Sequence, residues 1–393
     1  MRTWLLRMAL LACLLSYGTR HLCSQAISPS AEPFDKLVAR AQSAMESDHV
    51  AEAIRLYTRA TALQPEWPEG WWHLGTLFYD SKQFLQARNS FMHFVAVERN
   101  QPGPGFAMLG LSEFQLKEYP KALASLERGI RLGLGDNRDF GRTVLYHDAI
   151  LDSLLGRPEF SITRLTLLAN RIAAAHPNSP KEAVLADTEL LDAFGIAGLR
   201  TPTLPSEISP HKAPLVREVG IAQALIALQD RVGAGEQFKR VLALYPSEPG
   251  VHYAYGVFLL KDNPTLAVAE FNREIQISPS HSAARIQLAL EFQRTAEYQR
   301  GLKYAKEAVT LAPNNFVAHV AYGRLLLALG KTQLAEQELR TAVKLAPGSP
   351  DAHFALSRAL AEAGKNAEAD RERAEFERLN ASNLNASPDA APH

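Results

Sequence analysis

Cysteine is almost absent from this chain of 393 residues, which contains only Cys13 and Cys23. Both lie within the segment 1–26, which the sequence predicts to be removable. The rest of the chain has no thiol, which excludes a disulfide framework, a cysteine nucleophile and a thiolate metal site. A net charge is lacking too, because 42 Lys and Arg balance 42 Asp and Glu. No strong field therefore attracts nucleic acid or an anionic membrane surface.

Long hydrophobic runs are also missing. The apolar run at residues 8–15 is too short to cross a bilayer. Arg2 and Arg7 flank its start, and Ser24-Gln25-Ala26 places small residues around a cleavage point. This pattern predicts a signal peptide over residues 1–26 and no integral membrane span after its removal. The protein is expected to be exported, either to the periplasm of a bacterial envelope or to the medium; a retained membrane anchor is the alternative.

Catalytic motifs are absent as well. The chain has no H-E-x-x-H and no G-x-S-x-G, and Gly133-x-Gly135 lacks the third glycine or the Gly-Lys-Ser/Thr of a phosphate loop. His147, Asp148 and Asp152 form the only local histidine and acid cluster on a predicted helix. Such a trio can bind a metal or act as an acid–base pair, but a solvated helix face is the expected reading. We therefore predict a protein that is not an enzyme and needs no cofactor or metal.

A fixed period marks the second half of the chain. Pro246, Pro279, Pro313 and Pro347 recur at nearly equal intervals, and each closes an apolar helical stretch. Proline ends a helix because it lacks an N–H and clashes with the preceding turn. A period of roughly 34 residues is typical of stacked helical repeats and not of a single globular core.

The repeats can be aligned on their large and small residues. One frame places in register Trp71, Leu74, Gly75, Phe78, Ala87 and Phe91; His252, Tyr255, Gly256, Leu259, Ala267 and Phe271; and His319, Tyr322, Gly323, Leu326, Ala335 and Leu339. The large residues give each helix one apolar face, and the small ones allow two helices to approach closely. On these residues the chain resembles the tetratricopeptide repeat (TPR) family, whose pattern is W-x2-L-G-x2-Y, A-x3-F and P over about 34 residues.

The resemblance implies an all-α, right-handed superhelical solenoid of helix hairpins, interrupted by an irregular helical middle segment. The expected organisation is a signal peptide at 1–26, an N-terminal array of about three repeats at 27–136, an irregular helical segment with a proline-rich connector at 137–214, a C-terminal array of about five repeats at 215–381, and a disordered tail at 382–393.

Three histidines, His252, His319 and His353, occupy the same position in three repeats. No carboxylate or second histidine recurs one turn later, so a metal ladder is not expected. Since the repeat pattern places a large packing residue there, the histidines are predicted to serve packing.

In TPR proteins the first helix of each repeat lines the concave surface, and the resemblance implies a protein or peptide partner there. On this basis the predicted partner-binding residues are Trp72, Tyr253, Arg324, Phe354 and Arg358. The expected function is a protein–protein interaction scaffold or adaptor outside the cytoplasm. The alternative is an accessory or carbohydrate-binding module of an envelope enzyme system, for which Trp67, Trp71 and Trp72 provide a cluster of aromatic side chains.

Overall fold

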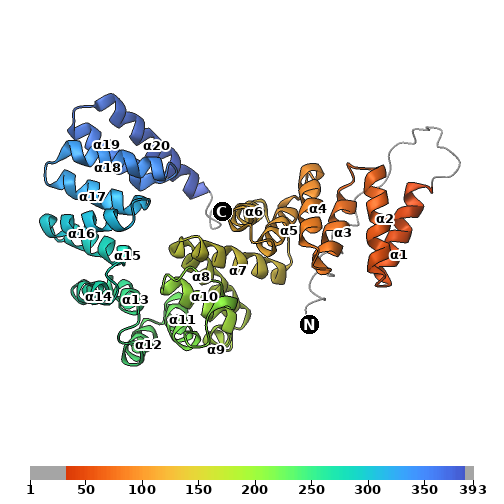
Figure 1. Ribbon diagram of the computed structural model, residues 1–393, viewed down its shortest axis with the longest axis horizontal. Coiled ribbons are helices and arrows are strands. Elements are labelled where there is room, and N and C mark those ends of the chain that lie inside the picture. Colours follow the sequence, from red (N-terminus) through yellow and green to blue (C-terminus); the bar gives the residue numbers. More distant parts are fainter. Residues whose placement is uncertain (1–31, 386–393) are drawn as a thin grey trace. The chain divides into compact units, whose positions relative to one another are not determined.

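The computed structural model describes residues 32–385. These residues form twenty α-helices and a short 3-10 helix, with no strand among them (Figure 1). The all-α helical-repeat solenoid expected from the sequence is confirmed. Its right-handed superhelical sense stays a prediction. The signal peptide predicted at 1–26 lies outside the described residues.

The chain divides into two compact units, Met1–Arg231 and Val232–His393. The described part of the first unit contains α1 (Phe34–Glu46), α2 (Val50–Leu63), α3 (Pro68–Asp80), α4 (Phe84–Val97), α5 (Gly103–Gln115), α6 (Tyr119–Leu132), α7 (Arg138–Leu154), α8 (Pro158–Ala175), α9 (Pro180–Leu185), α10 (Thr188–Gly198), η2 (Pro205–Glu207) and α11 (Ala213–Ala227).

Helix α12 (Arg231–Leu244) begins at the division between the units. The second unit continues with α13 (Val251–Leu259), α14 (Pro264–Ile277), α15 (Ser282–Arg294), α16 (Tyr298–Leu311), α17 (Phe316–Ala328), α18 (Thr332–Leu345), α19 (Pro350–Glu362) and α20 (Asn366–Asn385). Helix α20 continues past residue 381, where the sequence predicts the start of a disordered tail.

Most helices pair with a neighbour in sequence as antiparallel hairpins, namely α1 with α2, α3 with α4, α5 with α6, α7 with α8, α10 with α11, α13 with α14, α15 with α16, α17 with α18 and α19 with α20 (Figure 1). The turns inside many hairpins contain one residue with a left-handed backbone, such as Lys82 at φ 59° and Gly330 at φ 70°. A left-handed residue after the last helical position stops a helix and reverses the chain. The same device therefore closes hairpins in both units.

The two helices of a hairpin come closest at the expected small residues. A β-carbon added to Gly323 of α17 would lie 2.5 Å from Cγ of Leu339 on α18. Leu339 is fully buried and cannot move aside easily. Glycine at this position therefore sets how closely α17 and α18 pack.

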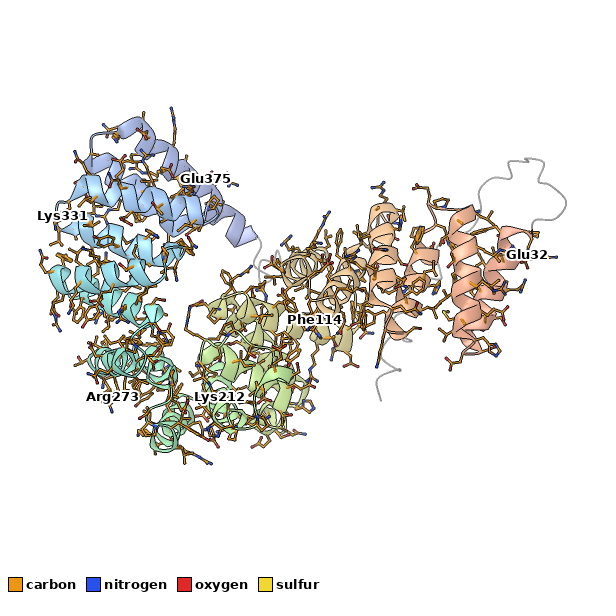
Figure 2. All side chains as sticks on the ribbon, viewed as in Figure 1. Glu32, Phe114, Lys212, Arg273, Lys331 and Glu375 are labelled. Atoms are coloured by element: carbon orange, nitrogen blue, oxygen red, sulfur yellow. The ribbon has the colours of Figure 1, made fainter. Side chains whose placement is uncertain are left out.

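The middle segment is continuous in packing with the helices on either side of it. Figure 2 labels Phe114, which belongs to α5. Its ring centroid lies 4.8 Å from that of His147 on α7. Further along, a β-carbon on Gly220 of α11 would lie 1.9 Å from the carbonyl oxygen of Leu191 on α10, so these two backbones touch. The proline-rich part of the segment 137–214 forms the loop between α10 and α11, two tightly packed helices of the first unit.

The last part of the helical middle segment forms two separate helices, α9 and α10. Asp187 separates them, because its side chain accepts a hydrogen bond from the backbone N–H of Leu190 at 3.1 Å and so caps the start of α10. Among the helices of the described residues, none combines the length and the apolar character needed to cross a membrane.

Candidate functional site

The predicted groove residues of the second unit fall on α13, α17 and α19. Phe354 is 40% exposed although it packs on Phe376 of α20 with ring centroids 5.1 Å apart. Arg358, one turn further along α19, is exposed. Arg324 of α17 reaches towards α19, where its Nη2 lies 3.6 Å from Oδ1 of Asp351. Phe354 and the two arginines thus offer an aromatic ring and two guanidinium groups at or near the surface of neighbouring first helices.

Tyr253 and Trp72 offer less surface. Tyr253 is only 5% exposed, and its ring packs against Phe271 and His281. Trp72 is half-buried, in contact with Phe91 and Phe94 of α4. Of the two, only Trp72 has substantial area for a partner in this conformation.

The three aligned histidines form a clasp that repeats along the second unit. In each case Nδ1 faces a carboxylate of the second helix, and Nε2 faces the carbonyl oxygen of the proline six residues earlier. The carboxylate distances are 2.5 Å for His252–Glu270, 2.7 Å for His319–Glu338 and 2.6 Å for His353–Glu372. The carbonyl distances are 3.1 Å to Pro246, 2.9 Å to Pro313 and 2.9 Å to Pro347. The histidines do pack in the interior, but they also tie the loop before each repeat to its second helix.

Both acceptors of a clasp are satisfied when the imidazole carries two N–H groups, because a neutral ring has only one donor. For His252 the hydrogen bond to Glu270 raises the pKa above its ordinary value, against the opposing effect of burial. The carboxylates belong to the following helix, eighteen or nineteen positions after their histidines, so a search one helical turn away could not find them. A glutamate recurs eighteen or nineteen residues after the histidine in all three repeats, and this recurrence is the sequence signal that could have indicated the contact.

Other repeats keep a nitrogen donor at the same position. In the repeat of α15 and α16 it is Arg285, whose Nε donates to Glu307 at 2.9 Å. In the repeat of α3 and α4 it is Trp71, whose indole N–H donates to the carbonyl of Pro65 at 2.7 Å. The clasp position therefore holds a histidine or an arginine that contacts a carboxylate in these repeats of the second unit, and a tryptophan in the repeat of α3 and α4.

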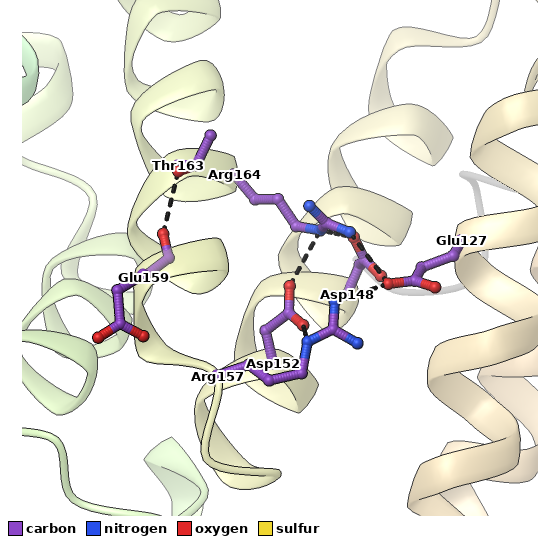
Figure 3. A network of polar contacts seen from close by, with 7 residues as sticks. All are labelled: Glu127, Asp148, Asp152, Arg157, Glu159, Thr163 and Arg164. Atoms are coloured by element: carbon purple, nitrogen blue, oxygen red, sulfur yellow. Dashed lines mark hydrogen bonds and ion pairs between the residues drawn. The ribbon is translucent and has the colours of Figure 1, made fainter. Parts of the chain in front are cut away.

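A second polar cluster lies inside the first unit (Figure 3). Asp148 and Asp152 of α7 are fully buried, which corrects the expectation that they lie on a solvated helix face. Arg164 of α8 pairs with Asp148 and, at 3.2 Å, with Asp152. Arg157 Nε lies 2.9 Å from Asp152 and its Nη2 2.9 Å from Glu127 of α6. This burial could not be predicted from local sequence, because the compensating residues Arg157 and Arg164 belong to the next helix and the turn before it.

Three carboxylates thus face two guanidinium groups in this cluster. Burial, only partly offset by the arginines, raises the pKa of Asp148 to about 6 and that of Asp152 to about 7. One proton held by the Asp148 and Asp152 pair balances the charge of the cluster. This arrangement ties α6, α7 and α8 together.

His147 does not join the two aspartates. Its Nδ1 faces the carbonyl of Thr143 at 2.8 Å, and its ring packs edge-on against Phe114. Burial lowers the pKa of this imidazole. Within residues 32–385, no group of three or more His, Cys, Asp or Glu side chains is arranged to hold a metal ion.

The helix hairpins, their period and the closing prolines define a helical-repeat protein. The tetratricopeptide repeat family model matches residues 38–92, 286–350 and 321–375. These segments of the chain carry tetratricopeptide repeats, and repeats of this class support a role as a protein–protein interaction scaffold.

Solved repeat structures resemble parts of the chain. MamA is 17% identical with a TM-score of 0.38, covering 42% of this chain and 97% of its own. YrrB, described as a TPR protein with an unusual peptide-binding site, is 17% identical with a TM-score of 0.37, covering 44% and 89%. PilF of Pseudomonas aeruginosa is 15% identical with a TM-score of 0.40, covering 44% and 78%. No curated protein matches the chain in sequence.

Proposed function

We propose that this protein is an exported adaptor that binds an extended, largely apolar peptide carrying an acidic group. The binding surface is formed by the first helices of the C-terminal repeats. The observation that carries this proposal is the exposed Phe354 with Arg358 one turn away on α19, near Arg324 of the preceding repeat. A part-exposed aromatic ring supplies an anchor, and guanidinium groups form charge-assisted hydrogen bonds with carboxylates.

The side chain of Arg324 is already oriented towards α19 by its contact with Asp351. Its contact with Asp351 at 3.6 Å is loose, and the Asp351 side chain is largely exposed, so a peptide carboxylate can replace it at little cost. Among the described residues, Arg358 has no ion-pair partner of its own. The two arginines can therefore serve a ligand without first breaking a strong internal contact.

The test is a pull-down from envelope extract with the chain starting at Ile27, followed by affinity measurement on the captured partner. Arg324→Ala with Arg358→Ala should weaken binding by at least about tenfold, which corresponds to 1.4 kcal/mol. The same double variant should change the free energy of unfolding by no more than about 0.5 kcal/mol, because both side chains are at the surface. Arg371→Ala with Arg373→Ala, two exposed arginines on α20, is the matched charge control.

Unchanged binding by the Arg324 and Arg358 variant would move the site elsewhere, with the surface around Trp72 as the next choice. Export is tested separately by mass spectrometry of the protein from its native host. A chain that begins near Ile27 supports the proposal, whereas an intact Met1 contradicts it.

A further inference from the structure

A surface slot of about 340 Å³ lies between α2, α3 and α4 of the first unit. Its floor is one stripe of α3, formed by Trp71, Leu74 and Phe78. Trp71 is fixed in place, since its ring stacks on His93 at 4.3 Å and its N–H is bonded to Pro65. The volume lies in the range of small-ligand sites, about 300–1,000 Å³.

The interior of the slot is apolar although several lining side chains carry hydroxyl groups. Those of Thr58, Thr61 and Ser90 donate to carbonyl groups of their own helices, at 2.7, 3.0 and 2.9 Å. All residues that line the slot are described, and none of them is Asp, Glu, Lys or Arg. An uncharged occupant is therefore favoured, because a buried charge would find no counter-charge there.

One rim of the slot is a polar row along α4. Gln86, Asn89 and His93 follow one another at a spacing of three and four residues, and all three are exposed. Amide side chains both donate and accept hydrogen bonds, as a peptide backbone requires. The floor from Trp71 to Phe78 is roughly 10 Å long at the helical rise, which matches about three residues of an extended peptide.

The slot occupies the place that a His–Glu clasp fills in the second unit. His319 stands at the position of Trp71, six residues after a proline, and Glu338 stands at the position of Ser90, nineteen residues later. Trp71 cannot form the ion pair, and the small Ser90 leaves room where a glutamate would lie. The repeat of α3 and α4 has thus exchanged an internal tie for an open, uncharged site.

We propose that this slot binds an uncharged segment of about three residues in an extended peptide. Apolar side chains would contact the stripe on α3, and the peptide backbone would be held by Gln86 and Asn89. This site goes beyond the proposed function, which uses other residues of the second unit. A single sugar ring would cover less of the elongated floor, and an oligosaccharide is the competing ligand in the test.

The experiment uses the full chain and NMR of its tryptophan indole and backbone amide groups. The probes are N-acetyl-leucyl-alanyl-leucinamide, its analogue with both leucines replaced by aspartate, and maltotriose. The neutral peptide should shift the Trp71 indole and the His93 amide in a saturable manner, and the acidic analogue should bind at least about tenfold more weakly. No shift with the neutral peptide, equal binding of the acidic analogue, or binding of maltotriose at these residues would each overturn the proposal.

Two variants localise the effect. The double change Trp71→His with Ser90→Glu grafts the clasp of the second unit into the slot and should reduce peptide affinity at least about tenfold. Thr58→Glu adds a charge on the exposed wall without altering a buried residue, and the same loss is expected. Its melting temperature serves as the folding control, so Thr58→Glu decides the question if the graft does not fold. Affinity retained in a folded Thr58→Glu protein would refute the assignment.

Discussion

His252 and Glu270 are joined by a contact of 2.5 Å between Nδ1 and Oε2, across the hairpin of α13 and α14. Glu274 is also close enough to favour the charged imidazole, and the carbonyl of Pro246 accepts from the other ring nitrogen. The raised pKa of His252 means that the folded state binds a proton more tightly than the unfolded chain does. The stabilising contribution is therefore complete below the ordinary pKa of 6.5 and is lost as the pH rises through the folded value.

We expect Glu270→Gln to lower the pKa of His252, because the substitution removes the charge and leaves the size of the side chain almost unchanged. An NMR titration of the His252 ring in the full chain measures this directly. Glu307→Gln, which breaks the matching pair with the non-titrating Arg285, is the control and should leave that titration unchanged. Identical His252 midpoints in the parent and in Glu270→Gln would contradict the prediction.

The buried cluster around Asp152 predicts a second pH dependence. The pKa values of Asp148 and Asp152 are raised, so the folded first unit holds a proton that the unfolded chain releases near pH 3.8. Stability of this unit should fall as the pH rises from about 4 to about 7. Asp152→Asn should flatten that dependence, since an amide keeps the shape without the titration.

Arg164→Ala should lower the free energy of unfolding of the first unit by about 3–5 kcal/mol, because it removes a positive charge that compensates the buried carboxylates. Urea unfolding followed by tryptophan fluorescence is a suitable measurement, since all three tryptophans of the described residues, Trp67, Trp71 and Trp72, belong to the first unit. An Asp152→Asn protein with the same pH dependence as the parent would show that the proton is held elsewhere.

Close packing at Gly323 predicts a local loss of stability. Gly323→Ala forces Leu339 to move and should cost about 1–3 kcal/mol. Gly348→Ala is the matched control, because an added β-carbon there meets no atom within 4 Å. In a repeat array the damage should stay with α17, α18 and their neighbours. Hydrogen exchange that shows equal loss of protection at Phe91 and at Leu339 would argue against such local coupling.

The closing prolines of the sequence indicate where the second helix of a repeat ends, because a single residue type determines that end. Helix α12 ends at Leu244, two residues before Pro246, and α16 ends at Leu311, two residues before Pro313. Proline disfavours the helical conformation of the residue before it, so the stop follows from local chemistry alone. The close approach of Gly323 and Leu339 could also be predicted, because the family pattern fixes a small residue in the first helix and a large one in the second helix of each repeat.

The polar contacts could not be predicted in this way. His252 meets Glu270 only because α13 and α14 cross at one particular register, and Asp152 is buried only because α8 supplies Arg164. Neither partner lies within one turn of its counterpart, so local periodicity carries no trace of either contact. The slot beside Trp71 could not be predicted from local periodicity either, since its open volume depends on Ser90, nineteen residues away.

The left-handed residues in the hairpin turns have a consequence for how such a chain can change over time. Each of these turns is closed at one backbone position, as at Lys82 and Gly330, so adding or removing a single residue there would misplace the reversal. Gain or loss of a whole hairpin keeps every turn intact and presents the same kind of face to the next helix. Length variation among descendants of this chain should therefore come in steps of about 34 residues, with single-residue insertions confined to looser stretches such as the loop between α10 and α11.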